Sequence, residues 1–136
     1  MNKNLLSTLS AIIISTALIS LCSQKTTSQN LIYLHQQTKS LNTFITTGDV
    51  ILDFYADWCN PCKRMSPLID AVAALMPQFT FIKINRDNFR DLAKSYNITS
   101  IPTLIFLRDG KEIGRYDGGP LTETKLQNLV SSVYNK

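Results

Sequence analysis

The feature that most constrains the fold is a short apolar segment that leads into a pair of closely spaced cysteines. The segment Val50 to Tyr55 is almost continuously apolar, as in a strand that is buried on both faces of a sheet. Cys59 and Cys62 follow shortly after it, with Asn60 and Pro61 between them. Proline suits the first turn of a helix, because its fixed φ fits and its missing N–H would have no partner there. The pattern therefore predicts a strand that delivers two thiols to the start of a helix.

The order of the other elements predicts the fold class. The helix is expected over Pro61 to Met76, where apolar residues recur at helical spacing before the stop signal of a proline. Alternating strands and helices, then a hairpin and a closing helix, predict a single α/β domain with a central mixed β-sheet flanked by helices on both faces. The remaining expected elements are strands at 30–34, 80–85, 103–107 and 112–116, and helices at 38–46, 88–96 and from near 122 to just before the end of the chain.

The first thirty residues have the layout of an export signal. A short positively charged start, residues 1–4, precedes an apolar run diluted by Ser and Thr at 5–21, and a polar stretch follows. We therefore expect a signal peptide at 1–22, a polar linker at 23–30 and one domain at 31–136. An uncleaved N-terminal anchor is the alternative, although the apolar run is short for a spanning helix.

Cys22 stands at the junction between the apolar run and the polar stretch. The segment Leu18 to Cys22 resembles the lipobox of bacterial lipoproteins, in which the cysteine is acylated and becomes the first mature residue. The motif normally has Gly, Ala or Ser where this chain has Leu21. A lipid on Cys22 would anchor the domain to a membrane, whereas ordinary cleavage nearby would release it. The sequence leaves both alternatives open.

The distribution of charge argues against a nucleic-acid partner. The formal net charge is +4, and Lys and Arg are scattered along the chain without a block of like charges. No helix-turn-helix, zinc-finger or aromatic RNA-binding pattern is present in the sequence. We therefore expect a mildly basic, solvated surface and no nucleic-acid function.

Several further residues stand in a fixed order around the cysteines: Asp53 in the strand, Trp58 to Lys63 around the pair, Pro67, Lys83, Ser100 to Thr103, and the Gly118, Gly119 pair. With these matches, the domain resembles the thioredoxin family over nearly all of its length after the export segment. The resemblance implies the thioredoxin fold and a protein-disulfide oxidoreductase that needs no cofactor beyond its own redox-active Cys59–Cys62 disulfide.

The two cysteines are expected to have different roles. Cys59 lies at a helix N-terminus, where free N–H groups and the helix dipole favour a thiolate and lower the thiol pKa, so it is expected to attack. Cys62, one turn further on and less exposed, is expected to resolve the mixed disulfide. A Cys-x-x-Cys pair is also half of a zinc site, but the other candidates, Cys22 and His35, are far away in sequence, so no metal site is expected.

Asp53 and Lys83 are expected to support proton transfer. A carboxyl inside an apolar strand loses hydration, which raises its pKa and suits exchange of protons with a thiol. The resemblance implies that Asp53 accepts the proton of the resolving cysteine and that Lys83, on the neighbouring strand, moderates the shift. The alternatives are a purely structural ion pair between the two, or a Lys83 that reaches solvent.

The resemblance also implies a client-binding surface around the cysteines, made of Trp58, Asn60, Pro61, Ile101 and Pro102. Ile101 and Pro102 correspond to the family's cis-proline loop, whose main chain binds an extended client segment. An ordinary trans turn is the alternative for that loop, and a simple lid over the helix end is the alternative for the tryptophan.

The direction of exchange is the least constrained property. Pro61, Ile101 and the Asp53 with Lys83 pair resemble reducing thioredoxins, which favours an exported, periplasmic or extracytoplasmic reductase of client proteins. We expect a monomer that receives electrons from a membrane-bound donor. Asn60 stands where thioredoxins usually have Gly, so a disulfide oxidase or isomerase on the same fold is an alternative, and a non-catalytic binding module is another.

Overall fold

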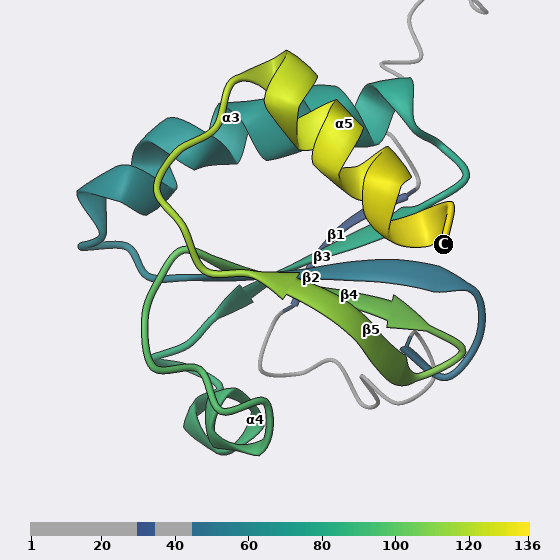
Figure 1. Cartoon of the computed structure of the whole chain (residues 1–136). Helices are drawn as coiled ribbons and strands as arrows, with labels where there is room; N and C mark the ends of the chain where they lie inside the picture. The colour runs from purple at the N-terminus through teal and green to yellow at the C-terminus, as the bar shows by residue number, and fades with distance from the viewer. Residues whose placement is uncertain (1–29, 35–44) are drawn as a thin grey trace, which may run out of the picture.

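The computed structural model describes residues 30–34 and 45–136, which form a five-stranded mixed sheet with helices on both faces (Figure 1). The predicted fold class is therefore confirmed. The strands are β1 (Leu31–Tyr33), β2 (Asp49–Tyr55), β3 (Thr80–Asn85), β4 (Thr103–Arg108) and β5 (Lys111–Tyr116), and the helices are α3 (Asn60–Leu75), α4 (Arg90–Ser95) and α5 (Glu123–Tyr134).

The sheet order places the strand before the cysteines in the middle of the domain. The strands lie in the order β1-β3-β2-β4-β5, with β1 and β2 parallel to β3, and β4 antiparallel to both β2 and β5. The β4–β5 hairpin turns at Asp109 and Gly110, both with positive φ, as the turn signal in the sequence predicts. A central strand is covered on both faces, which explains why β2 is nearly all apolar.

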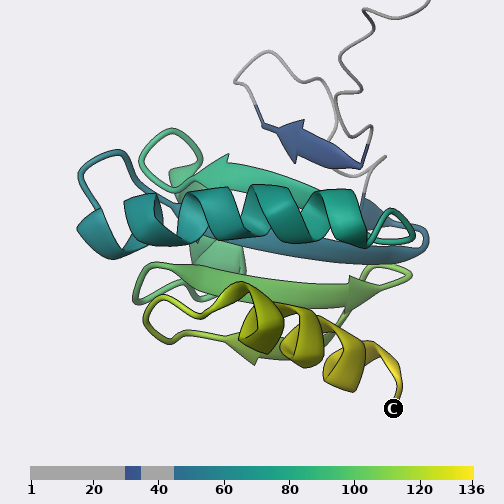
Figure 2. The same cartoon turned by 90° about the horizontal axis from the view of Figure 1, so that it is seen from above.

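Two apolar cores cover the two faces of this sheet. Helices α3 and α5 lie side by side on one face, and α4 lies on the other (Figures 1 and 2). Successive side chains of a strand point to opposite faces, so Ile51 joins the core under α3 and α5, while Leu52 joins the core under α4. Asp53 follows Ile51 by two residues, so its side chain lies on the same face of the sheet as that of Ile51 and faces α3.

Tyr134, the last residue of α5, forms hydrogen bonds that join this helix to the sheet. The hydroxyl of Tyr134 lies 2.7 Å from the carbonyl oxygen of Val50 and 3.1 Å from that of Leu107, and it donates to this pair of acceptors. The Tyr134 side chain is buried, and its burial raises the pKa of the phenol. The contact joins α5 to the adjacent strands β2 and β4.

The predicted boundaries agree with the structure for most elements, and α4 is the main exception. We expected a helix over 88–96, but it begins only at Arg90, because the amides of Asn88 and Phe89 both donate to the carbonyl of Asn85 in a turn. The signal peptide at 1–22 and most of the linker at 23–30 lie outside the described residues, as does the helix expected at 38–46 except for its last two residues. Within the described ranges, none of the helices has the length and apolar character needed to cross a membrane.

Candidate active site

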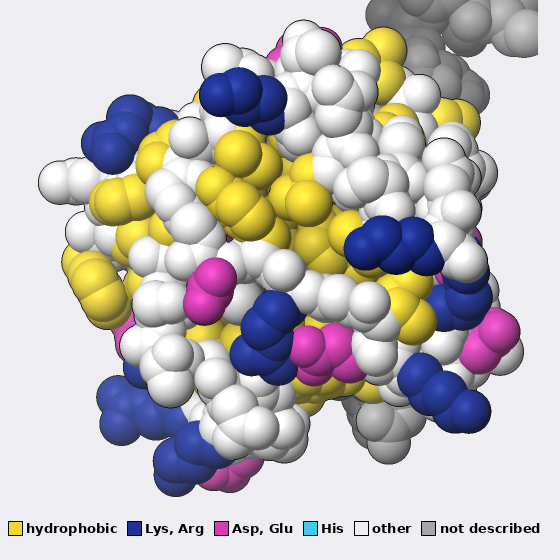
Figure 3. Space-filling model, in the orientation of Figure 1, with side chains coloured by type: hydrophobic (Ala, Val, Ile, Leu, Met, Phe, Trp, Pro, Cys, Tyr) yellow, Lys and Arg dark blue, Asp and Glu magenta, His cyan; other side chains and the backbone are white. Residues whose placement is uncertain are grey.

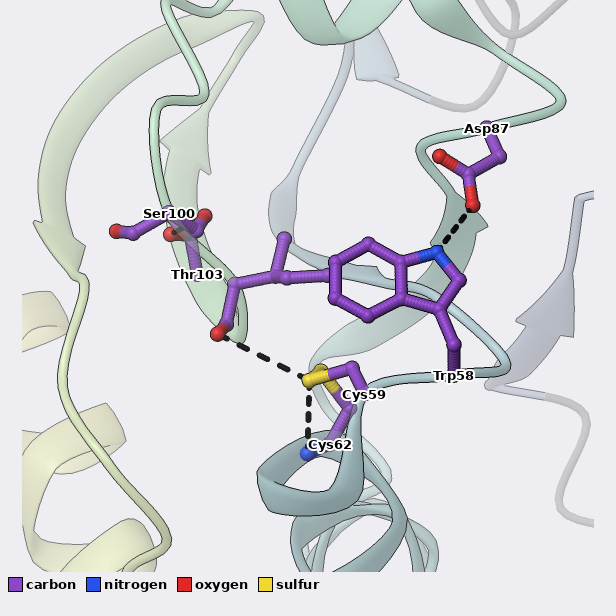
Figure 4. The surroundings of a disulfide bond; sticks show 7 residues. Trp58, Cys59, Cys62, Asp87, Ser100 and Thr103 are labelled. Atoms are coloured by element: carbon purple, nitrogen blue, oxygen red, sulfur yellow. Dashed lines mark hydrogen bonds between the residues drawn. A yellow bond between two sulfur atoms is a disulfide. The ribbon is translucent and has the colours of Figure 1, made fainter.

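The cysteine pair is built by the start of α3. Cys59 is the N-cap residue, with extended backbone at φ −79° and ψ 102°, and its Sγ accepts the N–H of Cys62 at 3.2 Å. A disulfide joins the two cysteines, whose Cα atoms are 5.2 Å apart (Figure 4). Pro61 lies in the first turn, where no N–H is needed. The prediction that Cys59 occupies a helix N-terminus is confirmed.

The expected difference in exposure between the two cysteines is wrong. Cys59 is 4% exposed and Cys62 is 5% exposed in the disulfide form. The reason is that Ile101 and Tyr55 pack against the cluster that the two cysteines form with Ala56, a tertiary contact that helical position alone does not predict. Any difference in reactivity between the two thiols must therefore come from their positions in the helix, because only the Cys59 sulfur accepts a hydrogen bond from an N–H group of the helix.

The loop before β4 faces the cysteine pair. The Ile101–Pro102 peptide bond is cis, as the resemblance implies, so the alternative of a trans turn is wrong. The carbonyl oxygen of Ile101 lies 3.9 Å from Cys59 Sγ and can accept from the Cys59 thiol once the disulfide is reduced (Figure 4). Thr103 donates to the carbonyl of Ser100 at 2.8 Å and closes the loop. The loop thus places a main-chain acceptor beside the reactive sulfur.

Trp58 presents an apolar surface next to the disulfide. The residue is 66% exposed, and its indole N–H donates to a carboxylate oxygen of Asp87 at 2.7 Å (Figure 4). Asn60 is also exposed, and Pro61 is half-buried. These residues flank the cysteine pair on the side that solvent reaches.

A cavity of about 280 Å³ lies behind Cys62 and reaches the buried carboxyl of Asp53. Asp53 is only 4% exposed, and its burial raises the pKa from 3.8 to about 6, an effect that the positive charge of Lys83 partly opposes. The predicted pKa elevation by desolvation is therefore confirmed. The cavity is lined by Asp53, Tyr55, Ala56, Asp57, Cys62, Lys63, Ser66 and Lys83.

Lys83 is in register with Asp53 across the β2–β3 pair, but it makes its ion pair elsewhere. Its side chain is 2% exposed, and its ammonium donates to Asp70 at 2.9 Å, to the hydroxyl of Tyr33 at 3.3 Å and to the hydroxyl of Ser66. The alternatives of an Asp53–Lys83 structural ion pair and of a Lys83 that reaches solvent are both wrong. Asp70, Ser66 and Tyr33 are residues of the site that the sequence analysis did not identify.

A signal for two of these residues was present in the sequence. Cys62, Ser66 and Asp70 are spaced four residues apart along α3, which puts them on one face of the helix. That face looks toward β3, from which Lys83 reaches Ser66 and Asp70. The burial of Lys83 would lower its pKa, but the hydrogen bond and the charge of Asp70 outweigh this effect and raise the pKa.

Within the described ranges 30–34 and 45–136, no group of three or more His, Cys, Asp or Glu side chains is placed so that it could hold a metal ion. Cys22 and His35, the other ligand candidates in the sequence, lie outside these ranges. On the face seen in Figure 3, Lys and Arg form separate groups with acidic groups among them.

A disulfide at a helix N-terminus beside a cis-proline loop, on a central mixed sheet, defines the class of thiol–disulfide oxidoreductases with this α/β fold. The sequence model of the Thioredoxin family matches residues 32–132. The chain belongs to the thioredoxin family, and its two close cysteines are those of a thiol–disulfide oxidoreductase.

Individual relatives agree with this assignment. The thioredoxin of Chlamydia pneumoniae is 41% identical over 99 residues, covering 73% of this chain and 92% of that protein. The thioredoxin of Chlamydia trachomatis is 45% identical over 74 residues, covering 54% of this chain and 72% of the relative. Among solved structures, a mutant thioredoxin from Halobacterium salinarum has a TM-score of 0.66 at 30% identity, covering 76% of this chain and 90% of that one. The oxidised thioredoxin of Plasmodium falciparum also has a TM-score of 0.66, at 27% identity, covering 75% and 96%.

Proposed function

We propose that the chain is an exported reductase of protein disulfides in which Cys59 attacks and Cys62 resolves. The observation that carries the assignment of roles is the N-cap contact, in which Cys59 Sγ accepts the N–H of Cys62 at 3.2 Å. A negative charge on this sulfur is stabilised by that N–H and by the helix dipole. The same stabilisation is absent for Cys62, which lies inside the helix.

The proposed cycle transfers two electrons from the dithiol to a client. The Cys59 thiolate attacks one sulfur of a client disulfide, forms a bond to it, and releases the other client sulfur as a thiolate that takes up a proton. Cys62 then loses its proton and attacks Cys59 Sγ, which forms the Cys59–Cys62 bond and breaks the bond to the client. The second client sulfur leaves with its electron pair and is protonated, so the client gains two thiols and the protein gains a disulfide.

Asp53 accepts the proton of Cys62 in this proposal. Both residues line the same cavity of about 280 Å³, which has room for a bridging water molecule. A pKa of about 6 leaves Asp53 ionised near pH 7 but close enough to neutrality to exchange protons efficiently. Lys83, which is also buried, contributes a positive charge that lowers the pKa of Asp53 and partly opposes the effect of burial.

The client segment docks in an extended conformation on the cis-proline loop. The main chain of Ile101 faces Cys59 and is the counterpart of an added strand. Trp58 supplies exposed apolar surface, held by Asp87, while Asn60 and Pro61 border the approach to the sulfur. This arrangement recognises main chain more than side chains, which suits a reductase of several clients.

The direction of exchange follows from the redox potential. We expect the full-length chain to have a potential close to about −270 mV, the value of reducing thioredoxins, and to reduce the disulfides of insulin with dithiothreitol as electron source. A potential near about −120 mV, that of a strong oxidant, would instead support the oxidase or isomerase alternative, to which Asn60 points. Cys59→Ser should abolish insulin reduction, whereas a non-catalytic binding module would keep its function.

Export is supported by the order of segments in residues 1–30, where a positively charged start is followed by an apolar run and then by a polar stretch. Outside the cytosol the oxidised protein has no access to cytosolic reductants, so a membrane-bound donor must return it to the dithiol. Fractionation of cells that express the wild type and Cys22→Ser, with labelled fatty acid, tests both export and lipidation. We expect the wild type outside the cytosol, and a label that is lost in Cys22→Ser identifies the anchored form; a chain found only in the cytosol would contradict export. We also propose a monomer, which sedimentation of the same samples checks.

A further inference from the structure

The ammonium group of Lys83 is fixed by three neighbours, and none of them is Asp53. Asp70 Oδ1 lies 2.9 Å from Nζ, the hydroxyl of Tyr33 lies 3.3 Å away, and Ser66 Oγ completes the set. These partners use all three donors of an ammonium group. Asp53, directly across the β2–β3 register from Lys83, makes no side-chain hydrogen bond to any residue in the described part of the chain.

Asp70 is the only anionic group among these neighbours, and it lies at the outer end of a polar helix face. Cys62, Ser66 and Asp70 follow one another at intervals of one turn of α3. The Asp70 side chain is 42% exposed, while that of Lys83 is 2% exposed. The buried ammonium group of Lys83 is thus held against α3 by a carboxylate that is partly exposed to water.

We propose that Asp70 is a positioning residue, which holds the Lys83 ammonium against α3 and so prevents it from pairing with Asp53, leaving Asp53 free to take the proton of Cys62. This inference rests on the proposed function of Asp53. An Asp53 carboxylate in direct contact with an ammonium group would be a much weaker base, because an adjacent positive charge strongly favours its ionised form. The supporting trend is that the charge of Asp70 raises the pKa of Asp53 and the charge of Lys83 lowers it.

The other groups around Asp53 and Lys83 do not replace Asp70. Tyr33 of β1 and Tyr55 of β2 are phenols, and the pKa of Tyr55 is raised by burial, so it is neutral near pH 7. Asp57 and Lys63 line the mouth of the cavity, are exposed and carry opposite charges. Cys62 carries no charge in the disulfide. Asp70 is therefore the one carboxylate in this set that contacts the ammonium group.

The first test measures the titration of Asp53 directly by carbon-detected NMR of its carboxyl in the oxidised full-length chain. We expect Asp70→Ala to lower the pKa of Asp53 by about one unit, because the ammonium group becomes available to Asp53. The matched control is Asp91→Ala, which removes an exposed carboxylate that pairs with Lys94 at 3.7 Å on α4. An unchanged titration in Asp70→Ala, or an equal change in Asp91→Ala, would overturn the inference.

The second test separates positioning from simple repulsion between two carboxylates. In a Lys83→Met background there is no ammonium group to position, so Asp70→Ala should lower the pKa of Asp53 by less than half as much as it does in the wild type. Equal shifts in the two backgrounds would show that Asp70 acts by charge repulsion alone, and the inference would be wrong. Asp70→Glu, which can still reach Lys83, should restore the wild-type titration.

The third test measures the rate of disulfide reduction as a function of pH. In single-turnover reduction of insulin by the reduced protein, Asp70→Ala should move the acid limb of the pH profile down by about one unit and slow the reaction near neutral pH by about threefold. An altered rate at all pH values with an unmoved acid limb would indicate a structural role only and would overturn the inference. Failure of the proposed function is distinguishable, because Cys59→Ser would then keep activity while the NMR titrations still report on Asp70.

Discussion

Asp53→Asn should stabilise the protein at neutral pH, although it replaces a residue of the proposed proton pathway. In the unfolded chain the carboxyl ionises with a pKa near 3.8, but in the folded protein burial raises the pKa to about 6. The folded state thus favours the protonated form of Asp53, and the contribution of this residue to the stability of the fold is fully present below about pH 4. That stability is lost as the pH rises from about 4 through about 6, since the unfolded chain can then ionise freely while the folded one cannot.

The size of the effect follows from the two pKa values. A difference of about two pH units corresponds to about 3 kcal/mol of lost stability above pH 7. Asn is neutral at every pH and has nearly the same shape, so it avoids the loss. Its amide faces the same cavity, where water can satisfy it. The stability advantage of Asp53→Asn should therefore be near zero at pH 4 and reach about 3 kcal/mol at pH 8.

The assay is urea unfolding of the oxidised full-length chain at several pH values between 4 and 8.5, compared with the wild type at each pH. The difference in free energy of unfolding should rise between about pH 4 and about pH 6, with its midpoint at about pH 5, and level off above about pH 7. Asp91→Asn, an exposed carboxylate on α4, serves as the control and should show a difference within about 0.5 kcal/mol throughout. A pH-independent difference for Asp53→Asn would refute the claim that the pKa of Asp53 is raised by burial.

Two further predictions concern α5 and the client surface. Tyr134→Phe removes the buried hydroxyl that donates to Val50 and Leu107, so urea unfolding should show a loss of about 1–3 kcal/mol in the free energy of unfolding. The control Tyr116→Phe, which loses a hydroxyl contact with Gly119, should show less than half of this loss. Equal losses in the two variants would contradict the anchoring role of Tyr134. Trp58→Ala should raise KM for insulin several-fold with kcat nearly unchanged. It should change the free energy of unfolding by less than about 1 kcal/mol, because the side chain is 66% exposed. A loss of kcat with KM unchanged would count against the role of Trp58 in docking.

Most of the fold was predictable because its signals are local. The apolar run of β2, the proline at the start of α3 and the Asp109 and Gly110 turn each fix the backbone over a few residues. The limits of β3 were predicted without error. The start of α4 was not, because the turn at Asn85 competes with the helix for the same amides, and helical periodicity does not show that competition.

The candidate site was predictable where chemistry and local structure coincide. Cys59 at a helix N-terminus and Asp53 in an apolar strand follow from residue types and their immediate context. The partners of Lys83 and Trp58 were missed, because Asp70 and Asp87 reach them only through the packing of α3 on the sheet and the course of the loop after β3. The equal burial of the two cysteines was missed for the same reason, since Ile101 comes from a distant part of the chain.

The roles of the two cysteines are tested most directly by trapping the mixed disulfide. The full-length Cys62→Ala variant, reduced and then mixed with a disulfide-containing client such as insulin, should accumulate a covalent adduct at Cys59 that dithiothreitol releases. Cys59→Ala should give little or no adduct, because its remaining cysteine lies one turn inside the helix and is 5% exposed in the disulfide form. Mass spectrometry of the peptide that joins client and protein identifies the cysteine. Adduct at Cys59 alone is the predicted result, and equal adduct at Cys62 in Cys59→Ala would contradict the account.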